Sequence, residues 1–195
     1  MAVKEIYPWA TIVRPTQLYG KDDRLTKWFA DMAQVYRMVP LIEGGKALTQ
    51  PVWVDDVARA IYYVCEDAPK FEGRRIDCFG PNDYTYAELA EFVNDIIDRN
   101  KPHPEVPYGI ARKIAEFMQY QRNPLITPDL IDRWTEDNIP EMTEAQYDAQ
   151  TDIDTKILTL KDLGIQPTPI EKEAFSYLHA YRFGGHFFRT KGYHP

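Results

Sequence analysis

The stretch ATIVRPTQLYG, residues Ala10 to Gly20, decides the fold class. Its first four residues are apolar or β-branched, which predicts a short buried strand, and the loop that follows contains Pro15 and ends at Gly20. A buried strand of this kind is typical of the interior of a sheet. Nine residues precede it in the sequence, so the question is what covers the sheet on that side.

The first 100 residues alternate between strand-like and helix-like stretches. Residues 21–40 (KDDRLTKWFADMAQVYRMVP) carry apolar residues at helical spacing, and Pro40 ends the predicted helix. Residues 41–54 (LIEGGKALTQPVWV) have the pattern of a hairpin with Gly44 and Gly45 at its turn. This alternation predicts an α/β layer architecture.

Two further helices and a strand complete this part. Asp55 and Asp56 open DDVARAIYYVCED, where a carboxylate can accept hydrogen bonds from unpaired backbone N–H groups. RRIDCFG predicts a short strand. TYAELAEFVNDII then predicts a helix with a capping box formed by Thr85 and Glu88.

The organisation changes after about residue 100, so we predict one region over residues 1–100 and a helical or irregular region over residues 101–195. Prolines divide the second region into short pieces, and one helix is predicted near residues 108–120. Residues 136–156 are acidic and weakly periodic, which predicts a solvated surface loop. Thr168 and Pro169 then favour the start of a last helix.

The C-terminal stretch SYLHAYRFGGHFFRTKGYHP combines basic and aromatic residues and has no acidic residue. Such a composition suits a surface that meets phospholipid headgroups or a partner protein. The alternative is a tail that packs on its own domain.

Composition limits the function classes. The net charge of −7 argues against nucleic acid as the main partner, and no run of 18 apolar residues is present. Cys65 and Cys78 stand alone inside apolar runs, which favours buried reduced thiols over a disulfide or a metal site. The first ten residues resemble neither a secretory signal nor a transit peptide.

No catalytic or metal-binding residue is predicted from the pattern. The sequence has no G-x-G-x-x-G and no P-loop, and its four histidines are scattered. Asp55 and Asp56 have the chemistry of acid/base carboxylates, but a helix cap explains them better.

Three ordered motifs resemble the short-chain dehydrogenase/reductase family in its extended or atypical form. They are AVKEIYPWATIVRPTQLYGKDDR, QPVWVDDVARAI and RIDCFGPNDYTYAELAEFV. PLITPDLIDRW and DLGIQPTPIEKEA further resemble a branch whose members are accessory subunits of mitochondrial NADH:ubiquinone oxidoreductase, respiratory complex I. The resemblance implies the C-terminal half of an NAD(P)-binding Rossmann-like fold.

The family's first half, with its Gly-rich loop and its Tyr and Lys helix, lies upstream of these motifs. A parallel sheet cut at that point exposes strand edges and half a core. We therefore expect the first half to be a separate chain docked on this one, or this sequence to be a fragment. A compact monomer that melts cooperatively would contradict this expectation.

The resemblance implies a non-catalytic role. The branch holds NADPH as a structural ligand, here shared with the other half, and lies on the matrix side of the mitochondrial inner membrane, where the arms of complex I meet. Implied partners are other complex I subunits, the chain carrying the first Rossmann half, and phospholipid at the membrane surface. The alternative is part of a short-chain reductase or nucleotide-sugar epimerase that is active with a partner chain.

Family position implies five cofactor-binding residues. The loop beside the nicotinamide end of the cofactor corresponds to Pro15, Thr16, Gln17 and Leu18, although Pro15 also serves as a strand terminator. Arg24 can reach a phosphate or a carboxylate. Its alternative role is an ion pair with Asp22 or Asp23 at the start of a helix.

Overall fold

The computed structural model describes residues 2–98, 100–122, 124, 126–150 and 156–182. The chain forms two compact units that interleave along the sequence. Unit 1 contains Met1–Leu18, Gln50–Asp83 and Ile139–Lys172, and unit 2 contains Tyr19–Thr49, Tyr84–Asn138 and Glu173–Pro195. The predicted boundary at residue 100 stays a prediction.

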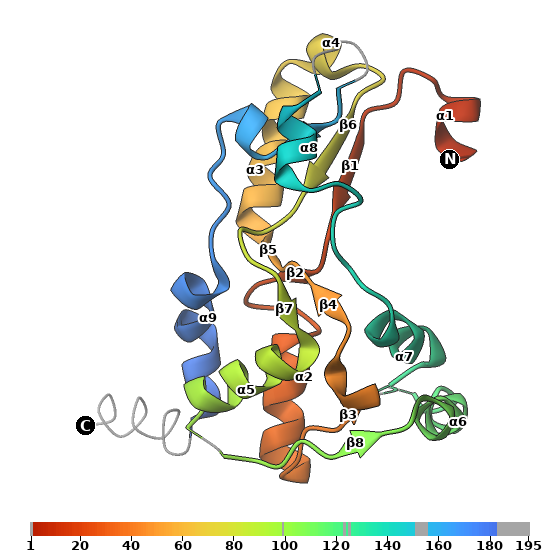
Figure 1. Cartoon of the computed structure of the whole chain (residues 1–195), viewed down its shortest axis with the longest axis vertical. Helices are drawn as coiled ribbons and strands as arrows, with labels where there is room; N and C mark the ends of the chain where they lie inside the picture. The colour runs from red at the N-terminus through yellow and green to blue at the C-terminus, as the bar shows by residue number, and fades with distance from the viewer. Residues whose placement is uncertain (1, 99, 123, 125, 151–155, 183–195) are drawn as a thin grey trace. The chain divides into compact units, whose positions relative to one another are not determined.

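Unit 1 is built on a parallel sheet of three strands. β6 (Arg75–Cys78) lies between β1 (Ile12–Pro15) and β9 (Leu158–Thr159). Figure 1 shows β1 and β6 side by side, with α3 (Val54–Glu66) along them. The parallel sheet with helices confirms the predicted α/β class.

The two faces of this sheet differ because side chains alternate along a strand. Ile76 and Cys78 point into the apolar core, where they meet Val57 and Ala60 of α3. The same core contains Val52, Phe71, Leu160 and Ile165. The other face carries Arg75 and Asp77, which are polar.

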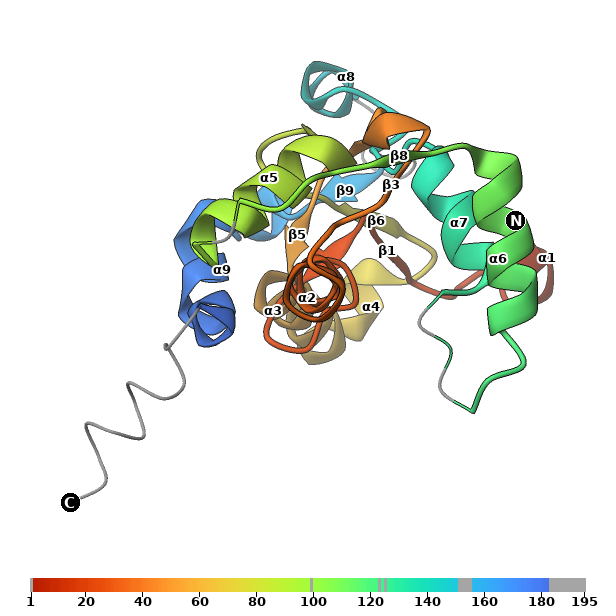
Figure 2. The same cartoon turned by 90° about the horizontal axis from the view of Figure 1, so that it is seen from below.

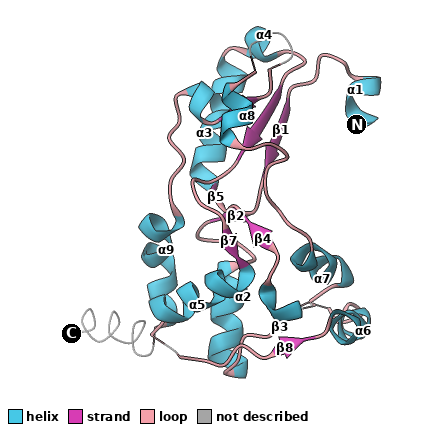
Figure 3. Cartoon of the chain, in the orientation of Figure 1, coloured by secondary structure: helices cyan, strands magenta, loops and turns pink. Residues whose placement is uncertain are grey.

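The remaining elements flank these strands (Figure 3). They are α1 (Ala2–Ile6), β2 (Leu18–Tyr19), β5 (Val52–Trp53), α4 (Ala68–Phe71), α8 (Glu144–Asp148) and the 3₁₀ turn Lys161–Leu163. α9 (Ile170–Leu178) begins in unit 1 and ends in unit 2, which also contains the 3₁₀ turn His179–Tyr181.

Unit 2 is mainly helical. Its helices are α2 (Thr26–Asp31), which continues as a π-helical turn over Met32–Tyr36, α5 (Tyr86–Ile96), α6 (Tyr108–Met118) and α7 (Pro128–Thr135). In Figure 2 α6 and α7 lie side by side, and Arg112 of α6 pairs with Asp132 of α7 at 2.9 Å. The predicted helices near residues 86–97 and 108–120 are confirmed.

The predicted hairpin over residues 41–54 is wrong. β3 (Leu41–Ile42) pairs in parallel with β8 (Glu105–Val106), and β4 (Leu48–Thr49) pairs antiparallel with β7 (Tyr84–Thr85). Gly44 and Gly45 do form a turn, in a 3₁₀ segment where both have positive φ. Each strand therefore has a partner far away in the sequence.

The acidic segment over residues 136–156 is not simply a solvated loop. Tyr147 of α8 is 1% exposed, and Glu141 is paired with two arginines. Residues 151–155 and the tail from residue 183 lie outside the described residues. No helix in the described part of the chain is long and apolar enough to cross a membrane.

The two cysteines differ, so the prediction that both are buried is wrong for one. Cys78 is fully buried, whereas Cys65 is exposed on α3. Burial, and then the carboxylate of Asp77, raises the pKa of Cys78 to about 12. Since the thiolate is the nucleophile, Cys78 is protected from alkylation because burial blocks the reagent and because its thiol stays protonated.

We expect iodoacetamide at pH 8 to alkylate Cys65 in the folded protein and to leave Cys78 unmodified. The rate at Cys78 should be lower by at least about a thousandfold, because its thiolate fraction is so small. Peptide mass spectrometry with and without urea measures this, and urea should make both thiols reactive. Equal rates in the folded protein would contradict the packing of β6.

Candidate functional site

The loop predicted to bind a cofactor leaves the carboxyl end of β1. Pro15 is the last residue of that strand, and the Thr16 N–H donates to the Cys78 carbonyl oxygen at 2.9 Å. The Thr16 hydroxyl donates to the carbonyl oxygen of Gln50. The loop is therefore fixed to the end of β6 and to the segment that precedes β5.

The rest of the loop is anchored through its backbone. The Gln17 carbonyl oxygen accepts from the Val52 N–H at 2.9 Å. Pro15 and Leu18 are exposed. In open α/β sheets ligands bind outside the carboxyl ends of the strands, so the loop lies at the edge where binding is expected.

Arg24 belongs to unit 2, and its side chain is exposed. Its predicted alternative role is wrong, because within the described residues it forms no ion pair with Asp22 or Asp23. Asp22 pairs with Lys27 at 3.5 Å. Asp23 accepts from the backbone N–H groups of Leu25 and Lys27, each at 3.1 Å, at the start of α2.

The polar face of the sheet carries a charged cluster that sequence reasoning missed. Arg75 donates from Nε and Nη2 to the two carboxylate oxygens of Asp77, at 2.7 and 2.8 Å. Arg75 Nη2 also donates to Glu141 Oε2 at 3.0 Å, and Arg14 Nη1 donates to Glu141 Oε1. The Tyr147 hydroxyl donates to Asp77 Oδ2 at 2.7 Å.

The Arg75–Asp77 pair at the centre of this cluster is largely removed from water, since Arg75 is 8% and Asp77 4% exposed. Burial, and then the carboxylate of Asp77, raises the pKa of the Tyr147 phenol, which keeps it a donor. The two arginines balance the two carboxylates in charge. The cluster therefore joins β1, β6 and the residues around α8, and it offers no free acid or base.

The sequence contained a usable signal for this cluster. Arg75 and Asp77 are two residues apart in a predicted strand, which puts them on one face, opposite Ile76 and Cys78. A charged pair on one face of a short apolar strand indicates a covered polar contact. The local sequence pattern does not predict which residues cover this contact. In the structure they are Glu141 and Tyr147.

The ion pairs of Glu141 make the free energy of unfolding of unit 1 change with pH in the acidic range. The guanidinium of Arg14, and then that of Arg75, holds the pKa of Glu141 below its usual range. A carboxyl group whose pKa is lower in the folded than in the unfolded state stabilises the fold at pH values above its unfolded-state pKa, which is about 4.3 for Glu. That stabilisation is lost as the pH falls through the lower folded value.

We therefore expect Glu141→Gln to lose less stability than the wild type when the pH is lowered from 7 to 3. Urea unfolding at several pH values measures the difference. Glu91→Gln removes an exposed carboxylate of α5 and serves as the control. Its stability should change with pH as that of the wild type does. An identical slope for the two variants would show that the Glu141 pairs do not persist in solution.

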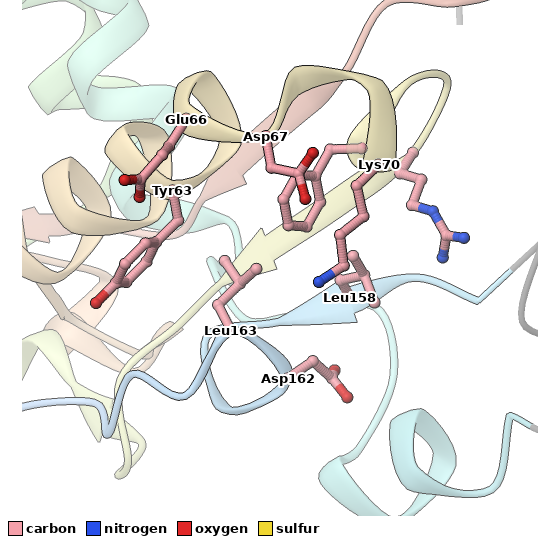
Figure 4. A pocket seen from close by; sticks show the side chains of 9 residues that line it. Tyr63, Glu66, Asp67, Lys70, Leu158, Asp162 and Leu163 are labelled. Carbon is pink, nitrogen blue, oxygen red and sulfur yellow. The ribbon is translucent and has the colours of Figure 1, made fainter.

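Two cavities lined by described residues of unit 1 are candidates for a ligand site. One, of about 410 Å³, is at the carboxyl end of β6 and is lined by Gln50, Phe79, Asp83 and residues 139–146. The other, of about 370 Å³, is lined by Tyr63, Lys70, Leu158 and Asp162 among others (Figure 4).

The cavity of Figure 4 lies near the amino ends of β6 and β9, away from the edge where ligands bind in such sheets. Its carboxylate Asp162 is already engaged, because it accepts from Lys156 Nζ at 2.7 Å and from the Thr159 N–H at 2.8 Å. The cavity at the carboxyl end of β6 is the better placed of the two.

No protein-family model matches the chain. Curated relatives cover nearly all of it. It is 30% identical over 195 residues to the NADH-ubiquinone oxidoreductase 40 kDa subunit, mitochondrial, of Neurospora crassa, a match that covers 95% of the chain and 45% of that protein. The chain is homologous to a subunit of respiratory complex I.

Two further relatives share one subunit name with each other. The NADH dehydrogenase [ubiquinone] 1 alpha subcomplex subunit 9, mitochondrial, of Arabidopsis thaliana is 31% identical, over 94% of the chain and 45% of that protein. The Mus musculus subunit is 29% identical, over 92% of the chain and 44% of that protein. The predicted likeness to these subunits is confirmed, and the chain spans less than half the length of each.

Solved structures agree on the fold. UDP-glucose 4-epimerase from Thermotoga maritima superposes with a TM-score of 0.54 at 17% identity, over 92% of the chain and 45% of the epimerase. An epimerase from Methanothermobacter thermautotrophicus gives 0.52 at 14% identity, over 93% and 45%. At this identity the likeness concerns the fold alone, and it confirms the predicted Rossmann-like class.

Proposed function

We propose that this chain is a non-catalytic accessory subunit of respiratory complex I. It supports assembly and stability where the peripheral and membrane arms meet, on the matrix side of the mitochondrial inner membrane. The observation that carries the proposal is its similarity, over 92–95% of its length, to proteins named as subunits of that complex. Its partners are then other complex I subunits and phospholipid at the membrane surface.

The sheet of unit 1 supports a shared Rossmann-like fold. Among the described strands β1 pairs with β6 alone, so its other edge is open to a further strand. Unpaired strand edges are usually covered in native proteins. Large apolar side chains near the start of the chain are exposed as well, at 54–68%: Val3, Ile6, Tyr7 and Trp9. A chain or segment with the first Rossmann half would cover both.

The loop at the end of β1 fits one end of a nicotinamide nucleotide. Pro15 and Leu18 present exposed apolar surface there, which suits a flat ring. The loop has no basic side chain for the phosphates, because Thr16 and Gln17 are its polar residues. We therefore propose that NADPH is bound jointly, with Pro15, Thr16, Gln17 and Leu18 at the nicotinamide end and the phosphates on the other half.

A role for Arg24 in nucleotide binding is a further part of the proposal, carried by unit 2. The guanidinium is exposed and has no ion-pair partner among the described residues, so it is available for a phosphate or carboxylate. In this proposal the bound nucleotide stabilises the fold and takes no part in a reaction, since Pro15–Leu18 contain no acid or base that could exchange a proton.

The test is purification of complex I in mild detergent from cells that contain this chain. We expect the chain in the complex in amounts equal to other subunits, by quantitative peptide mapping. Denaturing the complex should release about one NADP(H) per chain, measured enzymatically. Absence of the chain from the complex would overturn the proposal and favour a reductase or epimerase role.

Intact mass in the same sample tests the shared fold. A mass that begins at Met1 requires a copurifying chain with a Gly-rich loop, whereas a larger mass places both halves in one polypeptide. A mass that begins at Met1 with no such partner would contradict joint nucleotide binding.

A further inference from the structure

The cavity at the carboxyl end of β6 has the size and the composition of a small-molecule site. Its volume is about 410 Å³, within the range of about 300–1,000 Å³ that is common for ligand pockets. Phe79, Pro81, Ile139, Pro140 and Met142 give it apolar walls. Phe79 is held in place by stacking on Tyr147, with ring centroids 5.4 Å apart.

Gln50 gives this cavity an unsatisfied buried acceptor. The residue is 7% exposed and lines the cavity, and its Oε1 has no hydrogen-bond partner. Its backbone is fixed, because the carbonyl oxygen of Gln50 accepts from the Thr16 hydroxyl. A buried polar atom without a partner is destabilising, so a ligand that donates a hydrogen bond to it would remove that penalty.

The charges in the wall select the kind of ligand. Three carboxylates line the cavity, from Asp83, Glu141 and Glu144, and no Lys, Arg or His does. Glu141 is neutralised by Arg14 and Arg75, and Glu144 pairs with Lys161 at 2.9 Å.

Asp83 is the exception among these carboxylates. It is exposed and has no ion-pair partner within the described residues. The wall thus carries one uncompensated negative charge and an acceptor that needs a donor. Anionic ligands such as phosphates are disfavoured here.

We propose that this cavity binds a small organic cation, with an ammonium or amidinium group on an apolar body. The N–H groups donate to Gln50 Oε1 and to the carboxylate of Asp83, and the body packs on Phe79 and Met142. This goes beyond the proposed structural role, because the ligand is chemically opposite to a phosphate-bearing nucleotide and occupies residues outside Pro15–Leu18.

Saturation-transfer NMR on the protein as purified, alone or within its complex, tests the proposal with three matched probes. These are benzylamine, benzyl alcohol and benzoate, which share a ring and differ in charge. We expect transfer to benzylamine, weaker transfer to benzyl alcohol and none to benzoate. Transfer to benzoate equal to that for benzylamine would overturn the proposal, as would no transfer to any probe.

Two variants then locate the site. Gln50→Met removes the acceptor at similar volume, and Asp83→Asn removes the charge from an exposed position, so both should fold. Each should weaken benzylamine binding by about tenfold, which is about 1.4 kcal/mol. Gln50→Met should melt no lower than the wild type, since its Oε1 has no internal partner to lose.

Asp95→Asn, at an exposed carboxylate of α5 in unit 2, is the matched control and should bind like the wild type. Unchanged affinity in both Gln50→Met and Asp83→Asn would overturn the site. The outcome does not depend on complex I membership, because binding is measured directly on this chain.

Discussion

Replacing Asp77 by alanine should lower the free energy of unfolding by about 3–5 kcal/mol. Asp77 is 4% exposed and accepts both hydrogen bonds of the Arg75 fork, at 2.7 and 2.8 Å, as well as that of the Tyr147 hydroxyl. Its removal leaves the buried Arg75 with Glu141 as its remaining carboxylate. Glu141 is half exposed and contacts one nitrogen of the fork, so the buried charge of Arg75 would be poorly compensated, which is among the most costly defects that one substitution can cause.

Urea unfolding followed by pulse proteolysis measures this effect on the protein as isolated. The double variant Arg75→Met/Asp77→Leu is the decisive control, because it removes both charges and fills their volume with apolar groups. It should recover most of the lost stability. If the double variant is as unstable as Asp77→Ala, the loss comes from packing rather than from an uncompensated charge.

A second control separates the buried pair from the exposed one. Glu141 and Arg14 are each 52% exposed in their side chains, and exposed ion pairs contribute little to stability. Glu141→Gln should therefore cost far less than Asp77→Ala at pH 7. Equal losses would mean that Glu141, and not Asp77, compensates the charge of Arg75.

The parts of the fold that the sequence predicts correctly depend on local chemistry. The capping box forms as expected, since the Thr85 N–H donates to Glu88 Oε2 at 2.7 Å and the Glu88 N–H donates to Thr85 Oγ1 at 3.1 Å. Helices α5 and α6 follow from apolar spacing alone. Each signal lies within one turn or one helix face of its effect.

Two of the incorrect predictions depend on partners far away in the sequence. Leu41 and Ile42 look like one arm of a hairpin, but they pair with residues 105 and 106. Asp56 was expected to cap its own helix, yet its carboxylate accepts from the Thr168 N–H at 2.7 Å and pairs with Arg59. The residue types favoured a backbone contact in each case, and their spacing did not identify its location.

Only part of the candidate site could be predicted from the sequence, for the same reason. Family position indicated the loop Pro15–Leu18, and the structure places it at the carboxyl end of a parallel strand. Gln50 is fixed beside this loop by Thr16, 34 residues away, and Asp83 comes from a third segment. No local pattern joins these segments, so their cavity could be recognised only once the chain was folded.

Replacing Gly80 by alanine should also be strongly destabilising, by at least about 3 kcal/mol. A Cβ atom at this position would lie 1.8 Å from the carbonyl oxygen of Pro51 and 2.9 Å from its carbonyl carbon. Those atoms belong to the backbone, so no side-chain rotation relieves the overlap. Either the segment before β5 or the residues after β6 must move.

Gly109→Ala is the matched control, because a Cβ atom there meets nothing within 4 Å and the residue lies in α6. It should be stabilising by about 0.5–1 kcal/mol, since alanine favours the helix. Urea unfolding of both variants measures the contrast.

The same Gly80 contact fixes Pro51, whose neighbour Gln50 lines the cavity at the end of β6. Gly80→Ala should therefore also weaken benzylamine binding at urea concentrations where the variant is still folded. If alanine is tolerated within about 1 kcal/mol and binding is unchanged, the two backbones do not approach this closely in solution. Gln50 would then not be held at the wall of the cavity.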